Sequence, residues 1–178
     1  EISSISPRNT TISKRPDFYW AVDRNLVQEQ EFIISLSDSN GKEIFREEIA
    51  SFEFRFPENL PDLLPEKIYT WIVTTSDEEF ASEETYFKVL PEDRIDEFTS
   101  MYRNLRKKYI ASENTLFISY GTYLIEQKMY SDAFVYFNEI QKKTPDSRYI
   151  HQMLAITHLK QKLFLPYNQE ITILSKLK

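Results

Sequence analysis

The two histidines of the chain, His151 and His158, are the residues whose type and spacing come nearest to a metal site or a proton-transferring base. They are seven residues apart, about two turns of a helix, so both project from one side of it. A zinc pair on a helix is usually four residues apart, with a third ligand nearby. The spacing therefore favours surface or hairpin-packing histidines, and we predict no metal site.

The rest of the composition offers little catalytic chemistry. The chain has no cysteine, which excludes thiolate zinc sites, disulfides and cysteine nucleophiles, and its only glycines, Gly41 and Gly121, cannot build a phosphate-binding loop. No serine nucleophile elbow is present. The 28 carboxylates are so many that a pair at glycosidase distance would arise by chance. We therefore predict no catalytic residues and no cofactor.

Two short polar motifs are better explained by local structure than by ligands. The run Asp38-Ser39-Asn40-Gly41 resembles the start of a calcium loop, but its glycine comes two positions too early, so we interpret it as a turn. Asn9-Thr10-Thr11 fits a glycosylation acceptor, and we interpret it as a loop coincidence.

Charge and length limit the classes of partner. The net charge of −6 lies in short acidic clusters without a basic block, which argues against nucleic-acid binding. No apolar run is long enough to span a membrane. The chain begins without a methionine or a signal-peptide pattern, so we expect a mature or truncated fragment. Thirteen Phe, eleven Tyr and two Trp indicate a folded protein rather than a disordered one.

Residues 1–90 show the period-two pattern of antiparallel strands. Apolar residues alternate with polar ones in about seven short segments, a number typical of a β-sandwich. The segments are Ile2–Ser6, Phe18–Val22, Phe32–Leu36, Lys42–Ile49, Phe52–Phe56, Lys67–Thr75 and Glu84–Leu90. The Asn40-Gly41 pair predicts a hairpin, and Pro57, Pro61 and Pro65 predict a loop.

Residues 91–178 change to helical periodicity after Leu90-Pro91. We predict helices over Asp93–Tyr109, Asn114–Gln127, Ser131–Lys143 and Ser147 to about Lys162, and a closing helix over Tyr167–Leu177 after an interruption at Leu165-Pro166. In the first of these helices, the apolar residues recur at steps of three and four, which predicts one buried stripe.

The stretch Asn114–Pro145 carries a spaced motif, Phe117-x2-Tyr120-Gly121-x2-Leu124, Ala133-x3-Phe137 and Pro145. Small residues at Gly121 and Ala133 allow two helices to cross closely, and the large residues fill the space around the crossing. Ser131 or Asp132 is the candidate cap of the second helix. The spacing resembles a tetratricopeptide repeat. An ordinary helical hairpin is the alternative.

The flanking helices match the repeat less well, because Met153 stands where we expect a small residue. One complete repeat therefore needs its neighbours as caps.

The strand-rich half has a resemblance of its own. Leu63-x-Pro65-x3-Tyr69 resembles the fibronectin type III pattern, in which a leucine and a proline precede a strand whose tyrosine makes a corner, although Glu66 and Lys67 replace its usual glycine and threonine. Trp20 stands where such domains place a core tryptophan. The resemblance implies a fibronectin type III or immunoglobulin-like sandwich over Ile2–Leu90.

The order of the two halves resembles a bacterial family of unknown function that is common in cyanobacteria. The matching stretches are Pro7, Arg15-Pro16-Asp17-Phe18-Tyr19-Trp20, Phe32–Phe45, Tyr69-Thr70-Trp71 and Met129-Tyr130-Ser131-Asp132-Ala133. This resemblance implies a periplasmic or cell-surface protein and brings no catalytic residues with it. A cytoplasmic location is the alternative.

The first helix of the repeat supplies the candidate binding residues. In this class of fold its concave face binds extended peptides or partner helices. The face consists of Thr115, Ile118, Ser119, Thr122, Ile125 and Glu126. The other interpretation of these residues is internal packing.

The sequence thus predicts a two-domain, non-catalytic interaction or scaffolding protein of the bacterial envelope, with a protein or peptide partner. It leaves the partner's identity and the oligomeric state open. The alternatives are a carbohydrate-binding module that stacks sugars on sandwich aromatics such as Tyr19 or Tyr86, a cytoplasmic tetratricopeptide adaptor, and a hydrolase.

Overall fold

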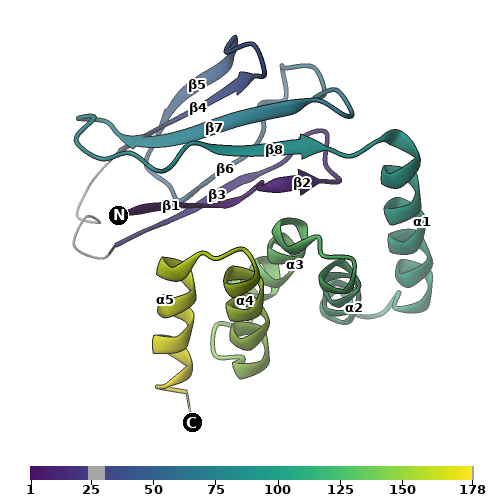
Figure 1. The fold of residues 1–178 in the computed structure, drawn as a ribbon. Coiled ribbons are helices and arrows are strands. Elements are labelled where there is room, and N and C mark those ends of the chain that lie inside the picture. Colours follow the sequence, from purple (N-terminus) through teal and green to yellow (C-terminus); the bar gives the residue numbers. More distant parts are fainter. Residues whose placement is uncertain (24–30, 178) are drawn as a thin grey trace. The chain divides into compact units, whose positions relative to one another are not determined.

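A computed structural model of the chain describes residues 1–23 and 31–177, which form two compact units, Glu1–Pro91 and Glu92–Lys178. Strands make up the first unit and five helices make up the described part of the second (Figure 1). The predicted order, a strand-rich half followed by a helical half, is confirmed. Within the described residues, no helix combines the length and the apolar character that crossing a bilayer requires.

The β unit contains two sheets, drawn as two layers in Figure 1. One sheet has the strand order β1 (Ile2–Ser6), β3 (Phe18–Val22) and β6 (Glu53–Phe54). The other has the order β2 (Asn9–Thr11), β8 (Thr85–Val89), β7 (Ile68–Thr75), β4 (Phe32–Asp38) and β5 (Glu43–Ile49). All paired strands are antiparallel except β2 and β8, which are parallel.

The aromatic residues predicted from the period-two pattern fill the space between the sheets. Tyr69, Trp71 and Val73 of β7 are buried on one face, as the alternation predicts. From the opposite sheet, the Phe18 ring packs edge-on against Trp71, with ring centroids 5.2 Å apart, and against Phe87 at 6.3 Å. These contacts join the two sheets through one aromatic core.

The predicted hairpin joins β4 to β5. The Asp38 carboxylate accepts hydrogen bonds from the backbone N–H groups of Asn40 (2.8 Å) and Lys42 (3.0 Å). Gly41 has a φ of +78°. This is the positive φ that an Asn-Gly pair favours in a hairpin turn.

Two predictions for the β unit are wrong. Residues 9–11, expected in a loop, form β2, because they pair with β8 in the register Asn9 to Phe87 and Thr11 to Val89. The predicted strand around residues 52–56 shrinks to the two residues of β6. The chain bends before it, where the Glu53 N–H bonds the Ser51 hydroxyl (3.2 Å), and Pro57 follows it.

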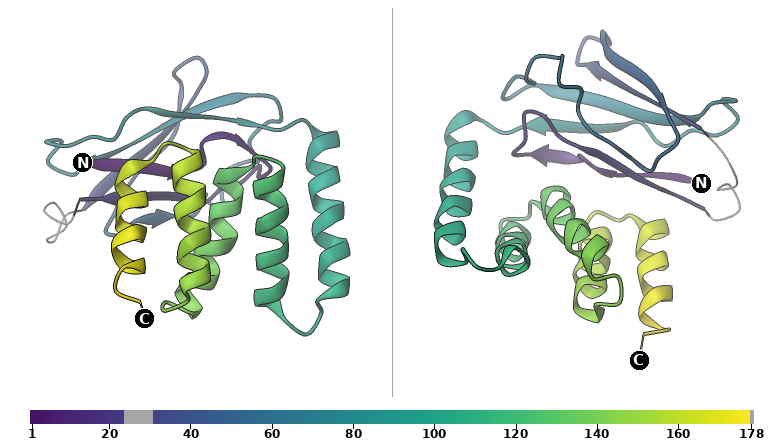
Figure 2. Two further views of the ribbon diagram at one scale, coloured as in Figure 1. Left: turned by 60° about the horizontal axis from the view of Figure 1, so that its bottom comes forward. Right: turned by 180° about the vertical axis from the view of Figure 1, so that it is seen from behind.

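The helical unit consists of five consecutive helices. They are α1 (Glu92–Lys108), α2 (Glu113–Glu126), α3 (Tyr130–Lys143), α4 (Arg148–Lys160) and α5 (Phe164–Leu174). From α1 to α5, each helix packs against the next in the chain (Figure 2). Ser147 caps α4 by accepting a hydrogen bond from the Ile150 N–H.

A 34-residue offset relates the α2–α3 hairpin to the α4–α5 hairpin. The helices α2 and α4 end 34 residues apart, and α3 and α5 begin 34 residues apart. Lys128 and Lys162 occupy the two connections with φ of +63° and +60°. In both, the next N–H bonds the carbonyl five residues earlier: Met129 to Leu124 at 2.8 Å, and Leu163 to His158 at 2.9 Å. This is the Schellman ending of a helix, used twice.

Three expectations for the helices are corrected. Ser131 and Asp132 lie inside the first turn of α3, whose N-cap is Met129, so neither is the N-cap residue of that helix. Pro166 does not interrupt the last helix but lies in the first turn of α5, where its missing N–H costs no intrahelical hydrogen bond. The small residue expected at Met153 is found at Ala155, 34 residues after Gly121.

Candidate functional site

The helix that carries the predicted binding residues is held in place by tight packing on its other side. A Cβ built on Gly121 would lie 2.8 Å from the Cζ atom of Phe137, so α2 and α3 touch with no room for a side chain. The Tyr120 hydroxyl donates a hydrogen bond to the Phe98 carbonyl oxygen (3.1 Å), which joins α2 to α1. The position of α2 is therefore fixed from both neighbouring helices.

Tyrosines from three helices surround this crossing. The Tyr120 ring lies edge-on to Tyr136 of α3, with centroids 4.9 Å apart, and to Tyr102 of α1 at 5.1 Å. Burial, reinforced by the negative charge of Asp132, raises the pKa of both Tyr120 and Tyr136 well above the ordinary value. Both hydroxyls stay protonated at physiological pH, and that of Tyr120 serves as a structural hydrogen-bond donor.

The six predicted binding residues lie along one face of α2. Their steps of three and four keep them on one side of the helix, while Leu116, Tyr120 and Leu124 are buried on the other. Thr115 and Glu126, at the two ends of the face, are exposed, and the four residues between them are half-buried. The face is accessible over the whole length of the helix.

The hydroxyl groups on this face are largely used by the protein itself. Thr122 donates to the Ile118 carbonyl oxygen (2.8 Å). Thr115 lies 2.8 Å from the hydroxyl of Ser112, the N-cap of α2. A hydrogen bond from Ser119, together with the nearby Lys108, lowers the pKa of Tyr109. The face offers a partner two isoleucines, Ile118 and Ile125, and one carboxylate, Glu126, beside hydroxyls that already bond within the chain.

The 34-residue offset brings a second set of residues to the corresponding face of α4. These residues are Tyr149, Gln152, Met153, Ile156, Leu159 and Lys160. Three large apolar side chains among them are exposed: Tyr149 by 46%, Ile156 by 39% and Leu159 by 47%. The helix predicted from Ser147 to about Lys162 contains these three residues, but the prediction gives them no role in binding. Adding 34 to each residue of the α2 face would have found them.

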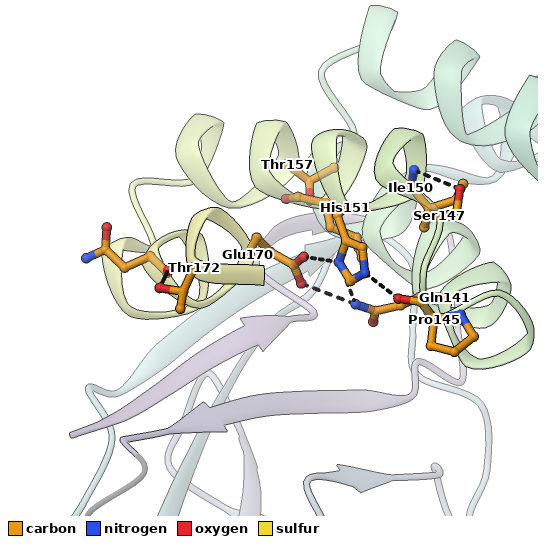
Figure 3. Close-up of polar contacts among 10 residues, drawn as sticks. Gln141, Pro145, Ser147, Ile150, His151, Thr157, Glu170 and Thr172 are labelled. Atoms are coloured by element: carbon orange, nitrogen blue, oxygen red, sulfur yellow. Dashed lines mark hydrogen bonds and ion pairs between the residues drawn. The ribbon is translucent and has the colours of Figure 1, made fainter. Parts of the chain in front are cut away.

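The arrangement closest to catalytic chemistry is a buried polar cluster between α3, α4 and α5 (Figure 3). His151 Nδ1 lies 2.6 Å from Glu170 Oε2, and His151 Nε2 lies 2.6 Å from the Pro145 carbonyl oxygen. Gln141 donates to the other Glu170 oxygen at 3.4 Å. Each ring nitrogen therefore faces an acceptor, which suits the doubly protonated imidazolium, although the Gln141 Nε2 donor also lies 3.2 Å from Nδ1.

The pKa shifts of this pair follow from burial and from the partners. Burial alone would lower the pKa of His151, but the hydrogen bonds to Pro145 and Glu170 outweigh it, so the pKa is raised. Burial raises the pKa of Glu170, against the opposing effect of His151 and Gln141. With His151 protonated and Glu170 ionised, the two side chains form a hydrogen-bonded ion pair.

The geometry suits a structural role. The His151 side chain is only 2% exposed and both of its nitrogens are bonded to protein, so it has no free nitrogen to take a proton from a substrate. In residues 1–23 and 31–177, no group of three or more His, Cys, Asp or Glu side chains could hold a metal ion. The sequence favours surface or hairpin-packing histidines, and both His151 and His158 are buried, which fits hairpin packing.

His158 is buried as well but in apolar surroundings. Its ring lies 5.4 Å from that of Phe134 in α3, and its Nδ1 atom has no hydrogen-bond partner among the described residues. Burial lowers its pKa to about 3, so the ring is neutral at physiological pH.

The β unit has an open pocket of about 490 Å³ between the β4–β5 turn and the loop before β7. Leu64 and Ile68, both exposed, line it together with Asp38 and Lys42. Neither aromatic residue suggested for sugar stacking takes part in this lining. Tyr19 is buried and offers no stacking surface, whereas Tyr86 is exposed.

Comparison with known proteins identifies no relative: neither the protein-family models nor the curated protein sequences contain a match to this chain.

Proposed function

We propose that this chain is a non-catalytic protein–protein interaction or scaffolding module of the bacterial cell envelope. In this proposal an antiparallel sandwich of fibronectin type III or immunoglobulin-like type precedes a tetratricopeptide-like domain. A protein or peptide partner binds along the exposed face of α2. The location in the envelope rests on the resemblance of the sequence to a bacterial family.

The 34-residue offset between the two hairpins supports the tetratricopeptide assignment. This is the length of the repeat in that class of protein. Small residues, Gly121 and Ala155, occupy equivalent positions of α2 and α4, and both connections end in the same hydrogen-bonded turn.

Packing and one side-chain contact support the sandwich assignment. The two sheets meet through Phe18 and Trp71, in the way that the inner faces of a sandwich interdigitate. The Tyr69 hydroxyl accepts a hydrogen bond from the Leu64 N–H (2.8 Å). A contact from this tyrosine to the backbone just upstream is what a tyrosine corner makes.

The observation that carries the binding proposal is the contrast between the two sides of α2. One side is locked against α1 and α3 through Tyr120 and Gly121, while the other presents accessible residues from Thr115 to Glu126. A partner that binds such a fixed surface loses little free energy to ordering it.

The test is crosslinked affinity capture from the envelope fraction of the native host, with wild type and Thr122→Arg compared. An arginine at this position obstructs the middle of the face, and we expect it to abolish recovery of the partner while the melting temperature stays within a few degrees. Thr172→Arg on α5 is the matched control, because Thr172 also donates to a carbonyl four residues earlier, at 2.8 Å. Equal recovery of the partner with both variants would show that the binding site does not lie on α2.

A carbohydrate-binding role for the β unit is the second candidate, favoured by the exposed ring of Tyr86. Retention of the full chain on polysaccharide columns would support it, and loss of that retention in Tyr86→Ala would locate the site. The interaction proposal expects no retention.

A further inference from the structure

Helix α4 has apolar residues on two sides, and only one of these sides is covered. Ile150 and Leu154 are buried in the helical unit. Tyr149, Ile156 and Leu159 lie on the exposed side. Single exposed apolar residues are common, but three in one row along a helix are a feature of binding surfaces.

The spacing of this row identifies the shape that fits it. Tyr149, Gln152, Ile156 and Leu159 follow one another at steps of three, four and three. This is the a/d spacing that one helix presents to another in knobs-into-holes packing. An extended peptide would instead bind through alternate side chains and backbone hydrogen bonds, which do not require a row of apolar residues at this spacing.

The charges beside the row identify the chemistry of the occupant. Arg148, Lys160 and Lys162 flank it and are exposed. Neither Lys160 nor Lys162 forms an ion pair with another described residue. Arg148 donates only to the Leu177 carbonyl oxygen (3.2 Å). Residues 92–178 contain thirteen Lys and Arg against ten Asp and Glu, whereas residues 1–91 contain nine against eighteen. The row therefore lies in the basic part of an acidic chain.

We infer that α4 docks an amphipathic helix of a partner protein, whose apolar seam packs on Tyr149, Ile156 and Leu159 and whose flanking Asp or Glu residues pair with Lys160 and Lys162. The inference rests on the proposed function and names the class of partner. It adds α4 to the binding surface and specifies a helix with acidic flanks.

The probe that tests this is a designed peptide of about 21 residues, three heptads, with Leu at a and d and Glu at e and g. The glutamates repel one another and keep the peptide from pairing with itself. Binding of the labelled peptide to the full chain is followed by fluorescence anisotropy. We expect Ile156→Asp to weaken binding at least tenfold, and the double variant Lys160→Glu/Lys162→Glu to weaken it and reduce its salt dependence.

The matched control is Ile171→Asp on α5, where an isoleucine is 42% exposed but lies outside the row, and we expect it to leave binding unchanged. A second peptide with Lys at e and g should bind at least tenfold more weakly than the glutamate peptide. A third peptide with two central prolines, which cannot form a helix, should not bind. Melting temperatures of all variants are measured, and if Ile156→Asp unfolds, the surface variant Lys160→Glu/Lys162→Glu decides the matter.

The inference is overturned if the glutamate peptide does not bind, if the lysine or proline peptide binds equally well, or if Ile171→Asp weakens binding as much as Ile156→Asp. It is also overturned if sedimentation shows a dimer of the chain that Ile156→Asp dissociates, because a second copy then covers the row. The capture experiment with Thr122→Arg tests the α2 face and does not depend on these results. Failure of this inference can therefore be distinguished from failure of the proposed function.

Discussion

Gly121 of α2 lies against the ring of Phe137 of α3 so closely that a Cβ on Gly121 would come within 2.8 Å of Cζ and 2.9 Å of Cε2. Phe137 is fully buried, so its ring has no free space into which to move. The separation of the two helices is therefore set by the absence of one side chain, and the orientation of the α2 face depends on this contact.

Gly121→Ala should destabilise the helical unit by about 1–3 kcal/mol, the usual cost of forcing extra atoms into a packed core. Gly121→Leu should cost considerably more. For a unit of this size, each kcal/mol lowers the melting temperature by about 4–8 °C. Thermal unfolding of both variants measures this, and Phe137→Leu combined with Gly121→Ala should recover part of the loss. Unchanged melting in Gly121→Leu would mean that the proposed crossing is wrong.

The first hairpin could be predicted because its close helix crossing requires particular residue types. A helix crossing this close needs small residues, and Gly121 and Ala133 supply them at the spacing where the large Phe137 can fill the gap. The second hairpin has Ala155 and Ile171 at the positions of Gly121 and Phe137, residues that occur in any helix, so its offset of 34 was not evident.

Features that depend on distant partners could not be predicted. Lysines at positive φ, such as Lys128, give no sequence signal, because that conformation normally favours glycine or asparagine. The strand β2 forms through pairing with β8, more than seventy residues away in the chain. His151 meets Glu170 only because α4 and α5 pack together.

Tyr69→Phe should lower the stability of the β unit. The Tyr69 hydroxyl accepts the Leu64 N–H at 2.8 Å, and removing it leaves that donor without its partner. We expect a cost of about 1–3 kcal/mol, measured by urea unfolding. Tyr86→Phe removes a hydroxyl from an exposed ring of the neighbouring strand and should change stability by less than about 0.5 kcal/mol. Equal effects of the two variants would contradict the corner assignment.

The His151–Glu170 pair should make stability fall as pH rises. Both pKa values are raised on folding, so the folded chain binds more protons than the unfolded chain. The contribution of His151 is complete below its unfolded pKa of about 6.5 and is lost as pH rises through the folded pKa. Urea unfolding between pH 6 and pH 9 should show a decline for wild type that His151→Leu/Glu170→Leu lacks.

The single variant His151→Leu should be less stable than that double variant, because it leaves the Glu170 carboxylate buried without its partner. Breaking a buried pair from one side typically costs about 3–5 kcal/mol, whereas replacing both members by apolar residues is often neutral. If the single and double variants are equally stable, His151 does not stabilise the buried Glu170 carboxylate.

His158→Leu should have the opposite outcome, although His158 is on the same helix and equally buried. Its Nδ1 atom has no hydrogen-bond partner among residues 1–23 and 31–177, so an apolar side chain of similar size removes a buried polar atom without breaking a bond. The folded pKa of about 3 lies below the unfolded value, so wild type loses stability as pH falls from about 6.5 towards 3. We expect His158→Leu to match or exceed wild type at pH 7 and to exceed it by a wider margin at pH 4, as measured by urea unfolding. A loss of more than about 1 kcal/mol at pH 7 would show that the His158 ring makes a hydrogen bond after all, and that the two histidines hold α4 in the same way.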